Sequence, residues 1–262
     1  MEGLKNMNVL SIDTTTNIAR AAIKKVSNTN FNNSEIIQQE ISNEVTHSEK
    51  LLPLIHETLR QLDLTLHDIS LLACINGPGS FTGIRIGLAT IKAFAQVENL
   101  PIYAMSSLEA IAFSTYVNNI LNKTSSSAYI ASLIDAKNDR VYFGVYKLSL
   151  DLNEKLIIET VLNISNEKID DACNLIKESL KFVSSLNSEI FFSGDCTNKF
   201  SENIKNTKLN ISNIFELYPT PADIISSIDL VMDKNKYMYN AFNFDAIYAR
   251  LSQAERVKNN EN

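Results

Sequence analysis

Three short apolar segments open the chain, and each has the length of a strand. They cover Met7–Asp13, Ile18–Val26 and Glu35–Ile41. The stretch Ser27–Ser34 lies between the second and third segments and is rich in Asn and Ser, a composition typical of turns. The pattern predicts three consecutive strands, with a polar turn that begins at Asp13.

The apolar period then changes to that of a helix. Leucines and isoleucines recur at helical spacing within Thr46–Leu62, and Thr46 or Ser48 can cap the start of this segment. A proline inside a helix removes a backbone hydrogen bond. Pro53 is therefore compatible with a regular helix that starts near Leu52 and holds the proline in its first turn.

Further strands and helices alternate up to residue 117. We expect, in this order, a strand at Leu71–Ile75, a helix at Ile84–Val97, a strand at Ile102–Ala104 and a helix capped by Ser106 or Ser107. The polar stretch Asn118–Ser127 follows and is the best linker candidate. Residues 1–117 are therefore predicted to form a first half.

The order of elements then repeats over residues 118–220, which we predict to be a second, smaller half. Its expected elements are strands at Ala128–Ile134, Arg140–Lys147 and Leu156–Leu162, a helix at Asp170–Phe182, a strand at Glu189–Ser193 and a helical turn at Asn198–Ile204. Both halves thus have the order β-β-β-α-β-α. This repetition predicts an α/β protein made of two halves of related topology.

The C-terminal part of the chain holds one more helix and an aromatic tail. Apolar residues at helical spacing in Pro221–Met232 predict a helix, and we expect the range 221–234 to complete the first half. The tail, residues 235–262, concentrates five aromatic residues between Tyr237 and Tyr248. Such density favours contact with apolar surface, either in the chain's own core or on a partner.

Charge and cysteine content narrow the classes of function. The net charge is −6 and no basic stripe is present, so we expect contact with nucleic acid only indirectly, through a partner. The three cysteines, Cys74, Cys173 and Cys196, are far apart and form no C-x-x-C pair, as in reduced cytosolic proteins. We expect neither a signal peptide nor a membrane span, and therefore a cytoplasmic protein whose start is Met1 or Met7.

Glycine is concentrated in one place. The chain has 7 glycines, and four of them lie between Gly77 and Gly87, where a predicted strand gives way to a predicted helix. The segment has no Gly-Lys pair, so it is not a P-loop. Gly77, Gly79 and Gly83 miss the G-x-G-x-x-G spacing of a dinucleotide site by one residue. Neither phosphate-binding motif is present.

Packing offers another explanation for these glycines. Gly83 and Gly87 are four residues apart on one helix face, and Thr90 continues the small-residue strip. A glycine inside a helix costs about 0.5–1 kcal/mol relative to alanine, so close approach of another segment should offset it. The approaching segment is either a helix of this chain or a helix of a second protein.

Six segments together resemble one known family. They are Ser11–Thr15, His47–Pro53, Asn76–Arg85, Ser106–Glu109, Leu133–Lys137 with Val141 and Tyr142, and Ile247–Arg250. In this order they resemble the TsaB (YeaZ) family, the dimerisation subunit of the bacterial machinery that places threonylcarbamoyl on adenosine 37 of tRNAs. The match is strongest over residues 7–110.

The resemblance implies an actin/Hsp70-like fold and a non-catalytic scaffold. Family members bind and activate the paralogous transferase TsaD through helices of the first half, and a small ATPase, TsaE, joins them. A homodimer formed through the same helices is a further expectation. The implied partner interface on this chain comprises His47, Leu51, Leu52, Ile55, Gly79, Gly83, Arg85, Gly87 and Thr90.

The resemblance also implies a cleft between the halves, where active relatives of the fold bind ATP. Here it would be a vestigial nucleotide cleft formed by Asp13, Thr14, Asp135 and Gly194, because both phosphate turns lack glycine. The two aspartates could hold a hydrated Mg²⁺ or could only accept N–H groups of their own turns. We expect no intrinsic cofactor, with ATP or ADP and Mg²⁺ binding only at the level of the complex.

An active ATP-dependent kinase or hydrolase of the same fold is the alternative function. It would use Asp13 or Asp135. We expect no metal site formed by histidines, because His47, His56 and His67 are nine and eleven residues apart. Along a helix, nine residues separate two side chains by about 13 Å, too far for one metal ion.

Overall fold

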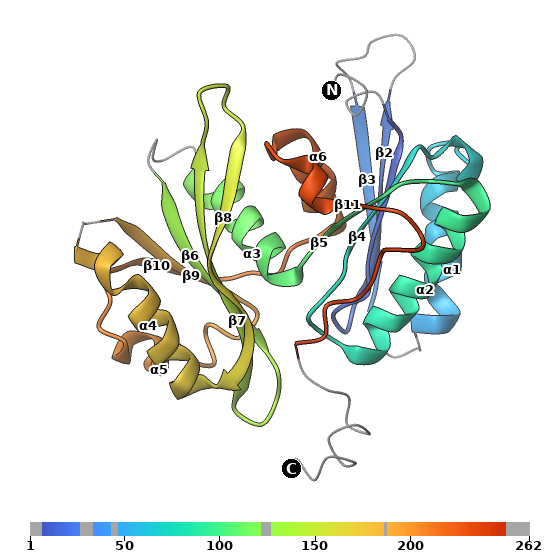
Figure 1. The fold of residues 1–262 in the computed structure, drawn as a ribbon. Coiled ribbons are helices and arrows are strands. Elements are labelled where there is room, and N and C mark those ends of the chain that lie inside the picture. The colour runs from blue at the N-terminus through green and yellow to red at the C-terminus, as the bar shows by residue number, and fades with distance from the viewer. Residues whose placement is uncertain (1–6, 27–33, 43–46, 122–126, 186–187, 250–262) are drawn as a thin grey trace.

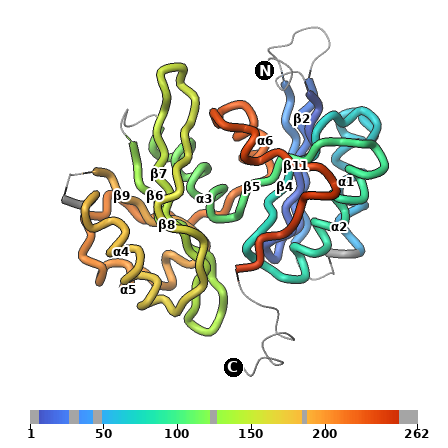
Figure 2. Tube along the Cα trace, viewed as in Figure 1, coloured from blue at the N-terminus to red at the C-terminus, as the bar shows by residue number. Residues whose placement is uncertain are grey.

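The computed structural model of the 262-residue chain describes residues 7–26, 34–42, 47–121, 127–185 and 188–249. Two β-sheets lie side by side, each covered on its outer face by helices, and two further helices lie between them (Figure 1). The C-terminal segment returns to the first half and runs along it (Figure 2).

The first sheet has six strands in the order β11-β5-β4-β1-β2-β3. Their bounds are β1 Val9–Asp13, β2 Ala19–Val26, β3 Ser34–Ile41, β4 Leu71–Ile75, β5 Ile102–Met105 and β11 Met238–Tyr239. β1, β4 and β5 run parallel to one another, whereas β2, β3 and β11 are each antiparallel to their neighbours. β1 and β4 are buried along their whole length, as expected of central strands covered on both faces.

Helices α1 (His47–Arg60) and α2 (Phe81–Glu98) cover the outer face of the first sheet. Their inward residues form one apolar cluster with alternate residues of β1 and β2, for example Leu51, Ile91 and Leu10. Pro53 lies inside α1, because this helix already begins at His47. The helix expected within Thr46–Leu62 is therefore confirmed, whereas the alternative start near Leu52 is wrong. The proposed Thr46 cap lies outside the described residues.

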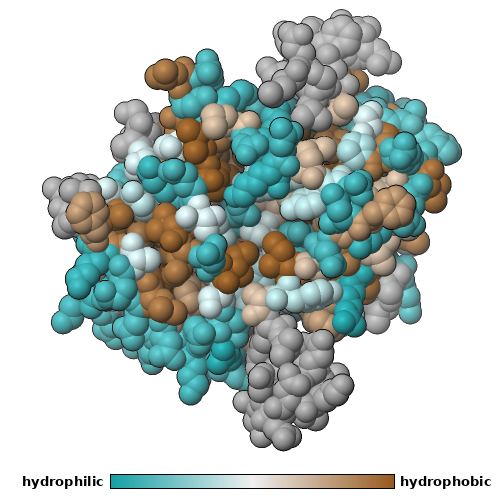
Figure 3. All heavy atoms as spheres, viewed as in Figure 1, coloured by the Kyte–Doolittle hydropathy of each residue, from teal (hydrophilic) through white to brown (hydrophobic). Residues whose placement is uncertain are grey.

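The second sheet has five strands in the order β10-β9-β6-β7-β8. Their bounds are β6 Ala128–Asp135, β7 Arg140–Leu150, β8 Leu156–Lys168, β9 Glu189–Gly194 and β10 Ile211–Glu216. Helices α4 (Ile169–Ser185) and α5 (Ser201–Asn206) cover its outer face. Hydrophilic residues line the lower edge of this half, where these two helices lie (Figure 3).

Helices α3 (Ser107–Thr115) and α6 (Pro221–Leu230) occupy the space between the sheets. α3 follows β5 in sequence but packs on β6 and β7 of the second sheet, whereas α6 packs on β1 and β4 of the first. α6 therefore lies on the first sheet, and the assignment of 221–234 to the first half stays a prediction. α3 lies within the predicted range 1–117 and contacts β6 and β7 of the second sheet, while its buried residues share one apolar cluster with residues of both sheets.

Both halves have the element order β-β-β-α-β-α-β-α, and both sheets have the matching strand order. The predicted α/β class with two related halves is therefore confirmed, and the duplicated topology is that of the actin/Hsp70-like fold. The hydrophobic pattern did not predict β10, the counterpart of β5, or β11, which has no counterpart in the second sheet.

The described part of the aromatic tail belongs to the first half. β11 pairs with β5, and the side chains of Tyr237 and Phe244 are buried. Phe242 is 89% exposed and Tyr248 is 44% exposed. Of the two expectations for the tail, contact with the chain's own core is therefore realised for the buried aromatics.

Candidate functional site

The glycine cluster packs against the turn that follows β1. A Cβ at Gly83 would overlap the carbonyl oxygen of Thr14, and a Cβ at Gly87 would overlap the Thr14 hydroxyl. A Cβ at Gly79 would overlap the backbone of Thr15. Gly83 and Gly87 are buried, so the prediction that they form a strip offered to a second protein is wrong. The approaching segment is the chain's own turn.

Hydrogen bonds fix this contact between the turn and α2. The Thr14 hydroxyl donates to the Gly83 carbonyl at 2.7 Å, and the Ser80 N–H donates to the Thr15 carbonyl at 2.7 Å. The Ser80 hydroxyl caps α2 by accepting the Gly83 N–H at 3.2 Å. The glycines therefore let α2 begin directly on the turn, because they leave room for the Thr14 carbonyl and the Thr14 hydroxyl.

The other predicted interface residues divide into buried and exposed ones. Leu51 and Ile55 are 1% and 2% exposed and belong to the core beneath α1, so their placement on a partner surface is wrong. Leu52 is 53% exposed, and Arg85 is exposed as well. Thr90 is half-buried, and its hydroxyl donates to the Ile86 carbonyl at 2.9 Å. The side chain of His47 lies outside the described residues.

The outward face of α1 and α2 is formed by residues other than the glycines that the sequence had suggested. On α2 it consists of Thr82, Arg85, Ala89, Ala93, Gln96 and Val97, and on α1 it includes Leu52, Pro53 and His56. Small side chains on α2 thus lie on the same side of the first half as an exposed leucine. The spacing of Ala89 and Ala93, four residues apart, is the feature of the sequence that could have indicated this small-residue face.

A cavity of about 410 Å³ lies between the halves. Its walls come from Thr15–Ile18, Arg20, Gly79, Ser80, Ile134–Lys137, Tyr142, Asp195 and Tyr218. Asp135 lines this cleft, whereas Asp13, Thr14 and Gly194 do not. The structure therefore brings only part of the predicted cleft set to the cavity. Arg20 and Tyr218 line it without having been predicted, and Asp195, the neighbour of Gly194, lines it as well.

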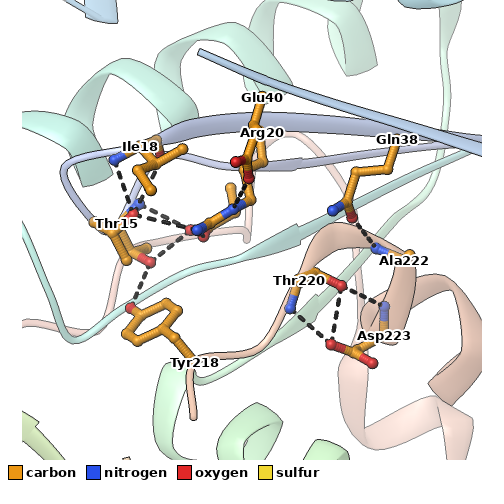
Figure 4. Close-up of polar contacts among 11 residues, drawn as sticks. Thr15, Ile18, Arg20, Gln38, Glu40, Tyr218, Thr220, Ala222 and Asp223 are labelled. Atoms are coloured by element: carbon orange, nitrogen blue, oxygen red, sulfur yellow. Dashed lines mark hydrogen bonds and ion pairs between the residues drawn. The ribbon is translucent and has the colours of Figure 1, made fainter. Parts of the chain in front are cut away.

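Asp13 is fully buried beneath the cleft. Its carboxylate accepts the Thr15 N–H at 2.8 Å and the Thr15 hydroxyl at 2.5 Å, and it forms an ion pair with Arg20 at 3.5 Å. Arg20 also binds Glu40 at 3.0 Å, and Tyr218 approaches the Thr15 hydroxyl at 2.8 Å from the other side (Figure 4). These contacts favour the interpretation that Asp13 accepts groups of its own turn.

Asp135 occupies the corresponding place in the second half and is held by lysines. It accepts the Lys137 N–H at 2.9 Å and lies 3.3 Å from the Nζ atoms of both Lys137 and Lys199. Burial raises its pKa, but the Lys137 hydrogen bond and the two lysine charges outweigh burial and lower the pKa overall. Neighbouring Asp195 accepts the Asp135 N–H at 2.9 Å, and burial raises the pKa of Asp195.

Gly194 packs tightly against a neighbouring strand, and the three cysteine thiols are buried. Gly194 has φ +146°, and a Cβ there would overlap the carbonyl oxygen of Leu133 in the neighbouring strand. Burial raises the pKa of the Cys173 thiol to about 11 and raises that of Cys74 and Cys196 further. In the described ranges no three His, Cys, Asp or Glu side chains group as metal ligands.

Comparison with known proteins decides the family. The family model described as "TsaD: tRNA N6-adenosine threonylcarbamoyltransferase" matches residues 35–246. Two curated relatives are each named "tRNA threonylcarbamoyladenosine biosynthesis protein TsaB". The protein of Bacillus subtilis is 27% identical over 80% of this chain and 82% of its own length. That of Buchnera aphidicola subsp. Baizongia pistaciae is 28% identical over 84% and 88%. The chain belongs to this family, on its TsaB (YeaZ) branch.

Solved structures of the TsaB (YeaZ) branch have the same fold as this chain. YeaZ from Pseudomonas aeruginosa superposes with a TM-score of 0.66 at 18% identity, over 92% of this chain and 99% of that one. A second Pseudomonas aeruginosa structure, described as similar to peptidase YEAZ, gives a TM-score of 0.70 at 19% identity, over 93% and 100%. At such identities the likeness concerns the fold alone. No helix within the described residues has the length and apolar character needed to cross a membrane.

Proposed function

We propose that the chain is a non-catalytic subunit that binds a TsaD-type paralogue and activates it for N6-threonylcarbamoylation of adenosine 37 in tRNA. Membership of the TsaB (YeaZ) branch supports the pathway. The single observation that supports a binding role is the outward face of α1 and α2. Leu52 and Val97 are 53% and 77% exposed there, above a core that is already filled.

The geometry of Asp13 supports the absence of catalysis in this subunit. ATP with Mg²⁺ in the cleft would need an accessible carboxylate on the first turn, but Asp13 is buried and already faces Arg20. The hydroxyl of Thr15 is bound to Asp13 and Tyr218. The residues of this turn therefore do not fit a magnesium-bound phosphate.

Further partners follow from the same proposal. A TsaE-type ATPase joins the pair of paralogues, and ATP or ADP with Mg²⁺ binds only in the complex. tRNA contacts this subunit only indirectly, in keeping with its net charge of −6, and the complex works in the cytoplasm. In the absence of the paralogue, two copies of the chain associate weakly through the same exposed helices.

The interface can be tested with two matched substitutions. Leu52→Glu places a charge on the α1–α2 face, whereas Leu152→Glu makes the same change at a fully exposed leucine of the β7–β8 turn. Leu52→Glu should weaken binding of the purified paralogue at least tenfold, and Leu152→Glu should bind like the unaltered chain. Equal binding of all three proteins would exclude this face as the interface.

The alternative kinase or hydrolase function has its own test. Calorimetric titration of the isolated chain with Mg-ATP should give no binding heat, and incubation should give no ATP turnover. Turnover that disappears on Asp13→Ala would establish the alternative function and overturn the non-catalytic proposal.

A further inference from the structure

The exposed face of α2 is positively charged on a chain that is negative overall. Along its 18 residues α2 has three charged side chains, Arg85, Lys92 and Glu98. Glu98 is paired with His67 at 2.8 Å. Within the described ranges, neither Arg85 nor Lys92 has a carboxylate within ion-pair distance. The face therefore presents the exposed Arg85, with half-buried Lys92 two helical turns along, and the described chain supplies an opposite charge to neither.

Arg85 is held in place before any partner arrives. Its guanidinium carbon lies 3.9 Å from the centre of the Phe81 ring, a cation–π contact. Phe81 in turn packs against Tyr248, with 5.4 Å between ring centres. The segment before Tyr248 is fixed by a hydrogen bond from the Ile247 N–H to the Asn76 carbonyl at 2.9 Å. A guanidinium held in this way loses little conformational freedom on binding.

Small side chains next to Arg85 allow close approach. Ala89 and Ala93 are exposed and lie one and two helical turns beyond Arg85 on the same face. A helix seated on the two alanines would lie close to the backbone of α2 and exclude water around the guanidinium. An ion pair formed there is stronger than one on an open surface, because less water lies around the two charges.

We propose that the occupant of this face is a helix of the paralogous subunit that presents a carboxylate to Arg85. This inference rests on the proposed function and adds the chemistry of the contact. Guanidinium and carboxylate can form two parallel hydrogen bonds, which fix the register of the partner helix as well as adding affinity. The carboxylate supplies the charge that α2 lacks.

The same charges make a second copy of the chain a poorer occupant. A symmetric dimer uses the same patch on both copies. If α2 packed against α2 across Ala89, the cations Arg85 and Lys92 of one copy would face those of the other. Like charges brought together in this way disfavour self-association, and α2 therefore discriminates between the paralogue and a second copy.

Binding measurements at low and high salt test the inference. The dissociation constant of the full chain with its TsaD-type paralogue should rise with salt. Arg85→Gln should weaken binding at least about fivefold and reduce that salt dependence. Arg85→Lys should restore the salt dependence but only part of the affinity. Lys181→Gln, which removes a charge from α4 where Lys181 is 75% exposed, should bind like the unaltered chain.

The outcomes separate this inference from the proposed function. If the unaltered chain does not bind the paralogue, both are overturned. If binding is lost in Leu52→Glu but unchanged in Arg85→Gln, only the carboxylate contact is overturned. Self-association of Arg85→Gln can be measured by sedimentation. It should equal or exceed that of the unaltered chain, because the variant removes repulsion between the cations of two copies. Weaker self-association would contradict the inference.

Discussion

The turns after β1 and after β6 occupy the same place in the two halves, and both begin with an aspartate. In the first turn Asp13, Thr14 and Thr15 are buried, and α2 begins directly on their backbone. The second turn is at the surface, where Lys137 and its two following residues are exposed. The duplicated topology therefore does not impose a common role on the two aspartates.

The difference between the two aspartates shows that the start of the first turn is part of the core, whereas the start of the second turn lines the cleft. Arg20, which is only 13% exposed, neutralises Asp13, so this acid contributes to packing and not to the cavity. Asp135 still lines the cavity but is neutralised by lysines. Substitutions in the first turn should therefore cost much more stability than equivalent changes in the second.

The largest effect is expected for Arg20→Gln. This change leaves the carboxylate of Asp13 buried without its cation, which should lower the free energy of unfolding by about 3–5 kcal/mol. The control Lys147→Gln breaks an exposed cross-strand pair with Glu159 in the second half and should cost less than about 1 kcal/mol. Urea unfolding of both variants gives the comparison. Equal losses would mean that the first turn is no more deeply integrated than the surface of the second half.

A smaller loss is expected for Gly83→Ala. The added Cβ meets the Thr14 carbonyl, a backbone atom that cannot rotate away, so α2 and the turn must separate. We expect a loss of about 2–3 kcal/mol in urea unfolding. Thr82→Ala, at the exposed neighbouring position, should change stability by no more than about 0.5 kcal/mol. An unaltered free energy for Gly83→Ala would contradict the close packing of α2 on the turn.

The smallest effect is expected for Asp135→Asn, with a defined pH dependence. The pKa of Asp135 is lowered in the folded chain, so its stabilisation is present above the unfolded pKa of about 3.9 and is lost as the pH falls through the lower folded value. The variant should lose less than about 1 kcal/mol at pH 7 and nothing in strong acid. If the difference in free energy of unfolding between the unaltered chain and the variant grew as the pH fell, it would contradict a lowered pKa of Asp135.

The hydrophobic periodicity of short segments predicted most of the helices and strands, but not which of them pack against one another. The strands from Val9 to Ile41 and the helix beginning near Pro221 followed from short-range periodicity. β10 was missed because Ile211–Glu216 is a half-exposed edge strand containing Ser and Asn. Its apolar positions are too few to give a clear alternation.

The site could be predicted only in part, because its contacts join distant parts of the sequence. The spacing of Gly83 and Gly87 correctly indicated a close approach, but Thr14, which fills that space, is 69 residues from Gly83. Tyr218 reaches Thr15 across 203 residues and lies in a loop without periodicity. Helical spacing identifies a face of α2, whereas only the assembled fold shows what lies against it.

Reconstituted tRNA modification tests the central claim most directly. Threonylcarbamoyl transfer to adenosine 37 would be measured with the paralogue alone, with this chain alone and with both, in the presence of the TsaE-type ATPase. The account predicts modification by the pair, none by this chain alone, and loss of the stimulation in Leu52→Glu but not in Leu152→Glu. Modification by this chain without the paralogue, or full activity of the paralogue without this chain, would contradict it.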